Sequence, residues 1–298
     1  MSREDFIFKG IATAIITPFK KDGTIDYEAY GRLIDRQIST GVSALVICAT
    51  TGESSTLSDS ERLKCTEFAL KRVDGRLPII VGSGSNCTSK AVMLSREASR
   101  LGCDGLLVVT PYYNKASPEG LIRHYTAVAD EVDKPIILYN VPSRTGVDIP
   151  PDVYAKLSEH ENIVAVKEAS GSLQKAKMIL NVCKGRLKVY SGNDDMIYDM
   201  LEAGAYGAIS VVSNIVPNET AGICESFFTN EFRAAQAHQK DLNSLISALF
   251  CEVNPIPVKY ALYLMGLCEC EMRLPLCPPS DSSRILIVNA LAEHRLIT

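Results

Sequence analysis

A single lysine interrupts an apolar segment in the middle of the chain. Residues 163–166 read Ile-Val-Ala-Val, which is typical of a strand buried on both faces, and Lys167 follows them directly. Burial disfavours the charged form of an amine and lowers its pKa, and a neutral amine is a nucleophile that forms a Schiff base with a carbonyl compound. The alternative is a lysine that pairs with the adjacent Glu168 or extends to solvent at the strand end.

The residues that could act together with this lysine come at the ends of other apolar runs. They are Thr50, Thr51, Tyr112, Tyr113, Tyr139, Arg144 and Gly192. Each has an ordinary structural explanation, such as a core aromatic, a helix cap or a solvated loop charge. As a group with the lysine they supply an amine for a carbonyl group, phenols for proton transfer, and cationic and amide donors for carboxylates. This combination favours Schiff-base chemistry on a small keto acid.

These residues need a scaffold that brings the ends of several strands together, and the apolar runs predict one. Eight short runs alternate with amphipathic, charge-bearing stretches, and they cover residues 10–19, 44–48, 78–81, 105–109, 135–139, 162–166, 187–190 and 207–211. Runs rich in Val and Ile are typical of parallel strands covered on both faces. We therefore predict an α/β fold, a (β/α)8 TIM barrel over residues 1–229 with a small C-terminal helical domain over residues 230–298. An open doubly wound sheet would show the same alternation, but eight successive units without a nucleotide fingerprint favour closure.

Length, composition and charge fit one enzyme-sized unit and exclude other classes of protein. The chain has 298 residues, 46% hydrophobic content and a net charge of −4. This charge gives no basic surface for nucleic acid or an anionic membrane. The charged start at residues 1–5 leads into no signal-type apolar segment, and no apolar run is long enough to span a bilayer. We expect a cytoplasmic protein with neither a nucleic-acid nor a membrane partner.

Neither the cysteines nor the histidines show a metal-binding pattern. The chain has ten cysteines, of which only Cys268 and Cys270 are close together, without the CxxC pairs that zinc prefers. The four histidines are scattered. We expect most of the cysteines to be small buried residues in a reducing compartment, and we expect no catalytic metal.

The segments around these candidate residues resemble the dihydrodipicolinate synthase family. The resemblance rests on residues 50–53 (Thr-Thr-Gly-Glu), 110–113 (Thr-Pro-Tyr-Tyr), 139–146 (Tyr-Asn-Val-Pro-Ser-Arg-Thr-Gly) and 166–169 (Val-Lys-Glu-Ala), and it extends to residues 254–259 and 273–275. The lysine motif alone is shared with the wider class I aldolase superfamily, including N-acetylneuraminate lyases and keto-deoxy sugar-acid aldolases. Arg144 and the pair Thr50-Thr51 favour the synthases over those lyases.

The resemblance implies a reaction between pyruvate and L-aspartate 4-semialdehyde. Lys167 would form a Schiff base with pyruvate, whose carboxylate is held at Thr50 and Thr51. The iminium would let the methyl group lose a proton, and the resulting enamine would attack the semialdehyde positioned by Arg144. No cofactor is needed, because the lysine itself supplies the electrophilic catalysis.

The resemblance also implies a proton relay and an assembly. Tyr139 would pass protons through Thr50 to Tyr113 of the partner subunit, and backbone carbonyls around Gly192 and Ile209 would shape the pocket. The expected assembly is a homotetramer, a dimer of tight dimers.

The resemblance also raises the question of whether L-lysine inhibits the protein. Feedback-inhibited bacterial members bind L-lysine in a pocket that corresponds here to Ser54, Ser55, Leu57, Asp59, Arg62, Asn86, Lys90 and Tyr112. In those enzymes a glutamate stands at the position of Lys90 and a histidine at that of Arg62, so the ligand's ammonium group would meet like charge here. We expect weak or absent inhibition. The alternative is that both are ordinary helix-face charges paired with Glu61 or Glu97.

Two other functions stay open at this point. The nearer one is a retro-aldol lyase that acts on a sugar keto acid, and an assay with both kinds of substrate would separate it from the synthase. The more distant one is a small-molecule sensor that kept the barrel and lost the chemistry. The set of Lys167, Tyr139 and Thr50 argues against the sensor.

Overall fold

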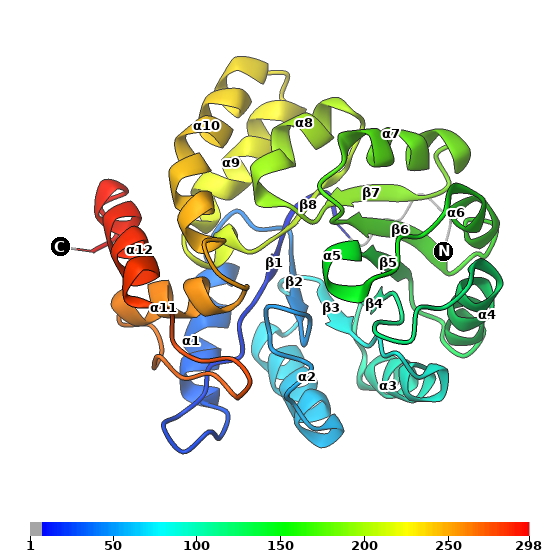
Figure 1. Ribbon diagram of the computed structural model, residues 1–298, viewed down its shortest axis with the longest axis horizontal. Helices are drawn as coiled ribbons and strands as arrows, with labels where there is room; N and C mark the ends of the chain where they lie inside the picture. The colour runs from blue at the N-terminus through cyan, green and yellow to red at the C-terminus, as the bar shows by residue number, and fades with distance from the viewer. Residues whose placement is uncertain (1–7, 298) are drawn as a thin grey trace.

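The computed structural model describes residues 8–297 and shows a closed barrel of eight parallel strands surrounded by helices (Figure 1). The strands are β1 (Gly10–Ala14), β2 (Ala44–Ile47), β3 (Ile79–Gly82), β4 (Gly105–Val109), β5 (Ile136–Asn140), β6 (Ile163–Glu168), β7 (Lys188–Ser191) and β8 (Gly207–Ser210). Each strand pairs in parallel with the next one, and β8 pairs with β1 to close the barrel. The predicted α/β barrel is confirmed.

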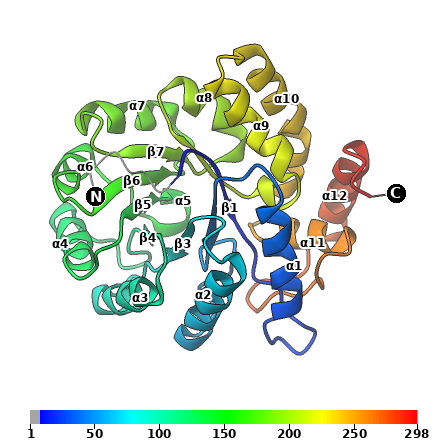
Figure 2. The same cartoon turned by 180° about the vertical axis from the view of Figure 1, so that it is seen from behind.

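Helices follow the strands and form the outer ring of the barrel (Figures 1 and 2). They are α1 (Tyr27–Ile38), α2 (Asp59–Val73), α3 (Thr88–Leu101), α4 (Pro118–Ala129), α5 (Pro142–Thr145), α6 (Pro151–Leu157), α7 (Leu173–Val182), α8 (Ile197–Glu202) and α9 (Pro217–Phe228), with 3-10 turns η1 (Asp194–Met196) and η2 (Val212–Asn214). Local signals fix several of their starts. At α2 the side chain of Ser58 accepts from the backbone N–H of Glu61, whose carboxylate accepts from the N–H of Ser58.

Three helices follow the barrel at the end of the chain: α10 (Phe232–Leu249), α11 (Ile256–Leu264) and α12 (Asp281–Glu293). In both views α11 and α12 lie beside α1, outside the ring (Figures 1 and 2). The predicted helical appendage is therefore present. The domain boundary after residue 229 falls in the turn between α9 and α10 and stays a prediction.

The barrel interior is filled by side chains from alternating strand positions. Ala12, Val46, Leu107 and Ile209 belong to this interior cluster. Phe8, just before β1, stacks on Tyr190 with ring centroids 4.2 Å apart and accepts a hydrogen bond from its hydroxyl at 2.6 Å. The interior is thus a packed core and not a channel, so chemistry is expected at the carboxyl ends of the strands.

The first apolar run was predicted to be longer than the strand that forms. Strand β1 ends at Ala14, and Ile15, Ile16 and Phe19 are buried outside the barrel ladder. A buried loop and a buried strand have the same apolar composition, so the pattern cannot separate them. The remaining runs match their strands to within about two residues.

The structure bears on disulfides, metal sites and membrane spans in the described residues. All ten cysteines are free. Within residues 8–297 no group of three or more His, Cys, Asp or Glu side chains could hold a metal ion. No helix in the same range is both long and apolar enough to cross a membrane. The charged start at residues 1–5 lies outside the described part of the chain.

Candidate active site

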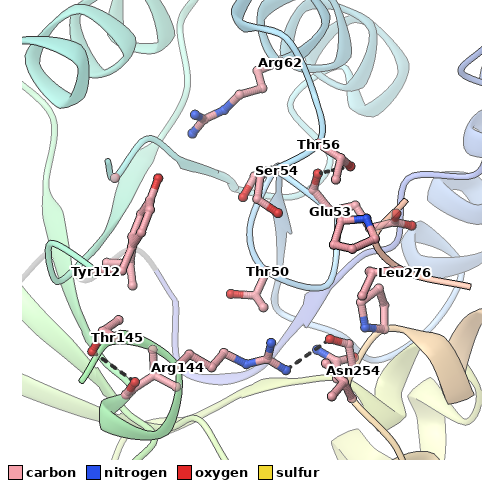
Figure 3. A pocket seen from close by; sticks show the side chains of 17 residues that line it. Thr50, Glu53, Ser54, Thr56, Arg62, Tyr112, Arg144, Thr145, Asn254 and Leu276 are labelled. Atoms are coloured by element: carbon pink, nitrogen blue, oxygen red, sulfur yellow. Dashed lines mark hydrogen bonds between the residues drawn. The ribbon is translucent and has the colours of Figure 1, made fainter. Parts of the chain in front are cut away.

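The carboxyl ends of the strands surround a pocket of about 280 Å³. Thr50 after β2, Tyr112 after β4 and Arg144 on α5 line it, and Figure 3 shows their side chains around one cavity. Thr50 also lines a smaller cavity together with Tyr139 of β5. Lys167 on β6 is the register partner of Tyr139. The barrel therefore brings these candidates to the same end of the molecule.

Lys167 is buried and forms no ion pair with an acidic side chain among the described residues. Its exposed fraction is 4%, and its Nζ lies 4.5 Å from the centroid of the Tyr139 ring. None of the ion pairs formed within residues 8–297 includes this amine. An amine held against an aromatic face, without a carboxylate to fix its proton, suits attack on a carbonyl carbon.

Glu168 faces away from the lysine, into the layer between the barrel and its helices. One carboxylate oxygen accepts from Asn140 Nδ2 at 3.0 Å and from the Tyr154 hydroxyl at 3.3 Å, and the other accepts from the Ser170 backbone N–H at 2.7 Å. Burial raises the pKa of Glu168, although the hydrogen bonds from Ser170 and Asn140 oppose the rise. Successive residues of a strand point to opposite faces, so the alternative of a Lys167–Glu168 pair is wrong.

Gly192 lies next to the lysine, and Ile209 lies in the barrel interior. A Cβ atom at Gly192 would lie 3.1 Å from Lys167 Cε and 2.5 Å from Ala169 Cβ. Ile209 is fully buried in the interior cluster. Glycine at position 192 therefore leaves the space that the lysine side chain occupies.

Asp194, two residues after Gly192, is a buried acid that the sequence did not identify. Its Oδ2 accepts from the backbone N–H groups of Val211 and Val212, both at 2.9 Å. Burial raises the pKa of Asp194, with hydrogen bonds and the charge of Lys167 opposing the rise. The acid ties the loop after β7, the strand next to that of Lys167, to the end of β8.

Thr50 and Thr51 differ in how their side chains are held. Thr51 is buried, and its hydroxyl oxygen accepts from Asn254 Nδ2 at 3.0 Å. Thr50 is half-buried and lines the pocket. A ligand carboxylate can reach the Thr50 hydroxyl, whereas the Thr51 side chain is held by a residue from the C-terminal part of the chain.

Asn254 also touches the arginine on the other side of the pocket. Its backbone oxygen accepts from Arg144 Nη2 at 3.1 Å, as Figure 3 shows, and its side-chain Oδ1 is buried without a partner in the described structure. Asn254 therefore connects Thr51 to Arg144. No local pattern predicts a role for Asn254, because its contacts span 203 and 110 positions along the chain.

Tyr113 is the one predicted relay residue that the fold does not bring to the site. Its side chain is 90% exposed and its φ is +74°. The described chain forms no hydrogen bond between the hydroxyl groups of Thr50, Tyr139 and Tyr113. Any relay through Tyr113 would require a phenol from a second copy.

Lys90 and Arg62, at the positions that correspond to the family's L-lysine pocket, do not pair with the carboxylates that the alternative named. Lys90 pairs with Asp59 at 2.9 Å, and Arg62 is buried with its Nη2 donating to the Gly82 backbone oxygen at 2.6 Å. Glu61 pairs instead with Arg273, and Glu97 with Arg100. The alternative, a pairing of these cations with Glu61 or Glu97, is wrong, because the helices place these carboxylates on other faces.

The whole chain matches known proteins in sequence and in structure. The model of the dihydrodipicolinate synthetase family matches residues 7–294. This chain belongs to that family. A relative from Pelobacter propionicus named 4-hydroxy-tetrahydrodipicolinate synthase is 46% identical over 98% of this chain and 100% of its own. A Geobacter sulfurreducens protein of the same name is 47% identical with the same coverage.

Solved structures of the dihydrodipicolinate synthetase family agree with this assignment. The dihydrodipicolinate synthase of Thermotoga maritima superimposes with a TM-score of 0.96 at 43% identity, covering 98% of this chain and 100% of its own. The enzyme from Aquifex aeolicus gives a TM-score of 0.95 at 44% identity, with 97% and 99% coverage. The family recognised from the sequence motifs is confirmed, and so are the barrel and its C-terminal helical part.

Proposed function

We propose that this protein is a 4-hydroxy-tetrahydrodipicolinate synthase, a lyase that condenses pyruvate with L-aspartate 4-semialdehyde. The observation that carries the proposal is the buried amine of Lys167, which forms no ion pair within the described structure and lies against the Tyr139 ring. Relatives with this name cover 98% of the chain. Arg144 at the mouth supplies the cation that a second, carboxylate-bearing substrate requires.

The first half of the reaction uses the lysine as an electron sink. Lys167 Nζ adds to the carbonyl carbon of pyruvate, and loss of water gives an iminium. The positive nitrogen then allows a methyl proton to leave, and an enamine forms. Thr50 and the backbone amides of its loop hold the carboxylate of pyruvate, while Thr51 stays fixed by Asn254.

The second half forms a carbon–carbon bond and releases the lysine. The enamine carbon attacks the aldehyde carbon of the semialdehyde, whose carboxylate Arg144 holds, and the aldehyde oxygen takes a proton. The substrate's amino group then attacks the iminium carbon, so that the ring closes and Lys167 leaves as the free amine. Backbone atoms at Gly192 and Ile209 border this space. The chemistry requires no cofactor.

Proton transfer and assembly belong to the same proposal. Tyr139 exchanges protons with the reacting atoms, and Thr50 links it to Tyr113 of the partner subunit. Support comes from the high exposure of Tyr113, whose phenol reaches no group of its own active site in the described chain. We propose a homotetramer made of two tight dimers, working in the cytoplasm, where a reducing environment suits ten free cysteines.

A trapping experiment tests the proposed nucleophile. Pyruvate followed by borohydride should add covalent mass to Lys167, because reduction makes the imine irreversible, and peptide mapping would locate it. Lys167→Ala should lose nearly all turnover and keep its fold. Lys177→Ala, on the outer helix α7, is the matched control and should be labelled like the wild type. A label on any other lysine would refute the assignment.

A substrate panel tests the reaction itself. The protein should consume pyruvate only when L-aspartate 4-semialdehyde is present. Sialic acid and keto-deoxy-gluconate should yield no pyruvate at the same protein concentration. Release of pyruvate from either sugar acid, without condensation activity, would favour the lyase.

A further inference from the structure

Cys48, directly after strand β2, breaks the alternation of that strand and turns toward helix α2. Val46 and Ala49 pack in the barrel interior, whereas Ile47 and Cys48 both belong to the layer between the barrel and its helices. Successive strand residues ordinarily face opposite sides, and Cys48 departs from this rule because its φ is +52°, in the left-handed region. Its thiol donates to the backbone oxygen of Arg62, on α2, at 3.6 Å.

A second cysteine lies on the same part of α2. Cys65 comes three residues after Arg62, and the Cys65 thiol is hydrogen-bonded to the thiol of Cys48. The backbone oxygen of Arg62 also accepts from the Thr66 hydroxyl at 2.8 Å, so the Cys48 thiol lies over the turn that carries Cys65. Both cysteines are buried, with exposed fractions of 1% and 0%. Contact between the two thiols is the first requirement for a disulfide.

The surroundings make the two thiols chemically unequal. The hydrogen bond from Cys65 lowers the pKa of Cys48, and the positive charge of Arg62 acts in the same direction, although burial opposes both. The same contact and burial raise the pKa of Cys65. The thiolate is the reactive form of cysteine toward peroxides. Cys48 is therefore the sulfur that reacts first, and Cys65 is placed to attack it afterwards.

Cys48 also borders a space that a small oxidant can occupy. It lines the smaller cavity, of about 30 Å³, together with Tyr139. A volume of this size holds a water molecule, and hydrogen peroxide is only one oxygen atom larger. Thr50, Ser54 and Arg62 line both this cavity and the 280 Å³ pocket, in which Figure 3 shows their side chains. The small cavity therefore adjoins the pocket, and a peroxide in it lies beside Cys48.

We propose that Cys48 and Cys65 form a redox-modification site at which a hydroperoxide converts the two thiols into a disulfide. The Cys48 thiolate attacks the peroxide, so that an S–O bond forms, the O–O bond breaks and hydroxide leaves. The Cys65 sulfur then attacks the resulting sulfenic acid. An S–S bond forms, the S–O bond breaks, and the oxygen leaves as water with the proton of Cys65. With hydrogen peroxide, the two thiols are oxidised by two electrons and the peroxide is reduced to two water molecules.

The disulfide would close a loop that contains Thr50 and Thr51. Its two sulfur atoms would lie only about 2.0 Å apart, so the end of β2, two residues before Thr50, would move toward α2. The expected effect on turnover rests on the proposed function, in which this loop holds the carboxylate of pyruvate. Oxidation should lower kcat/KM for pyruvate by at least about tenfold, because a small displacement of a binding group is costly.

A purely structural role for the two cysteines gives a different expectation. Cys183 and Cys224 are buried as well, and burial raises the pKa of both thiols. Cysteines of this kind are inert in the folded protein. If Cys48 and Cys65 were only small core residues, they would stay reduced as Cys183 and Cys224 do, and they would oxidise only after unfolding.

The test treats the full-length protein with hydrogen peroxide, blocks the remaining thiols with iodoacetamide and maps the peptides without reduction. The folded wild type should give a peptide that joins Cys48 to Cys65, lighter by two hydrogen atoms than the sum of the two thiol peptides. In Cys65→Ala the reaction should stop at the sulfenic acid of Cys48, which dimedone labels. Cys183→Ala is the matched control and should form the cross-link as the wild type does.

Several results would overturn the proposal. Exposed Cys87 and Cys277 report that the peroxide has acted, so their oxidation without a Cys48–Cys65 cross-link would refute the site. A cross-link that forms only in urea would refute it too, and so would pairing of Cys48 with any other cysteine. The mapping of the wild type needs no variant, so it decides the matter even if Cys65→Ala does not fold.

Turnover is measured separately on the same samples. The loss of kcat/KM for pyruvate should be reversed by dithiothreitol in the wild type and should be absent in Cys48→Ala. A cross-linked protein with unchanged kcat/KM would refute the effect on the loop. A protein that forms the cross-link but shows no pyruvate trapping at Lys167 when reduced would refute the proposed reaction and leave the redox site standing.

Discussion

Lys259 and Glu53 form a buried ion pair that joins the C-terminal helices to the loop carrying Thr50 and Thr51. Lys259 Nζ lies 2.5 Å from Glu53 Oε1, and both side chains have an exposed fraction of 0%. Nζ also donates to the backbone oxygen of Thr17 at 3.0 Å. The other Glu53 oxygen accepts from the backbone N–H of Arg273 at 3.2 Å. The C-terminal part of the chain thus fixes the shape of the loop with Thr50 and Thr51, which we propose to bind pyruvate.

Removing one member of this pair should be far more damaging than removing both. Lys259→Met leaves the Glu53 carboxylate buried and unpaired, which should cost about 3–5 kcal/mol of unfolding free energy. Combining it with Glu53→Gln should restore a large part of that loss. Urea unfolding of the single and double variants measures both values. Lys71→Met, which breaks an exposed pair with Glu67, is the control and should stay within about 0.5 kcal/mol. A Lys259→Met effect no larger than this control would contradict the argument.

Gly192→Ala should reduce turnover while the barrel still folds. The added methyl group would lie 3.1 Å from Lys167 Cε and 2.5 Å from Ala169 Cβ, so the lysine or its strand must move. A displacement of this size at a nucleophile should lower kcat by at least about tenfold. Steady-state kinetics and circular dichroism together give the answer. Gly120→Ala on α4, where the nearest contact is a serine hydroxyl at 3.3 Å, is the control and should remain active.

Asn254→Ala should affect the binding of pyruvate more than the binding of the semialdehyde. The variant loses the hydrogen bond from Nδ2 to Thr51, but its backbone oxygen can still accept from Arg144. Loss of one such bond is worth about 0.5–1.5 kcal/mol, so the KM for pyruvate should rise roughly two- to tenfold. The KM for the semialdehyde should change less. Asn289→Ala, on the exposed side of α12, serves as the control. A larger effect on the semialdehyde would assign Asn254 mainly to the Arg144 side.

The barrel and the cluster of candidate residues at its open end could be predicted from the sequence, because both depend on local signals. Unbroken runs of Val and Ile mark strands covered on both faces, and polar residues at their ends mark the open end of the barrel. Lys167, Tyr139 and Thr50 were found in this way. The contacts of Asn254 and Lys259 were missed because their partners lie 203 and 206 positions away, and no local pattern encodes such a contact. Arg62 was misjudged because its surroundings depend on how α2 is rotated against β3.

Arg144→Ala should impair the second substrate and spare the first. Arg144 is exposed at the mouth, so its guanidinium group can meet a carboxylate through a charge-assisted contact worth about 1.5–3 kcal/mol. Turnover of the semialdehyde should fall at least about tenfold, while pyruvate trapping at Lys167 persists. Arg123→Ala on α4, which only breaks an exposed pair with Glu119, should leave both unchanged. Equal loss of both steps in Arg144→Ala would mean that this arginine holds the keto acid.

His124 should make the folded protein sensitive to mild acid. It is buried on α4, and burial lowers its pKa to about 4 from an ordinary value of 6.5. The unfolded chain therefore binds a proton at this histidine more readily than the folded chain does. Above about pH 6.5 the ring is neutral in both states and the free energy of unfolding is unaffected by its titration. As the pH falls toward 4, the free energy of unfolding decreases by up to about 3 kcal/mol.

His124→Gln should remove that part of the pH dependence. Glutamine does not titrate, and its amide can still bond to the Thr88 hydroxyl, which lies 2.9 Å from Nδ1 of the histidine. Urea unfolding between pH 7.5 and pH 4.5 should show a shallower loss of stability in the variant than in the wild type. The variant can be less stable at pH 7.5, because the ring's packing against Tyr125 is lost. Parallel stability curves for the two proteins across this range would show that the acid sensitivity arises elsewhere.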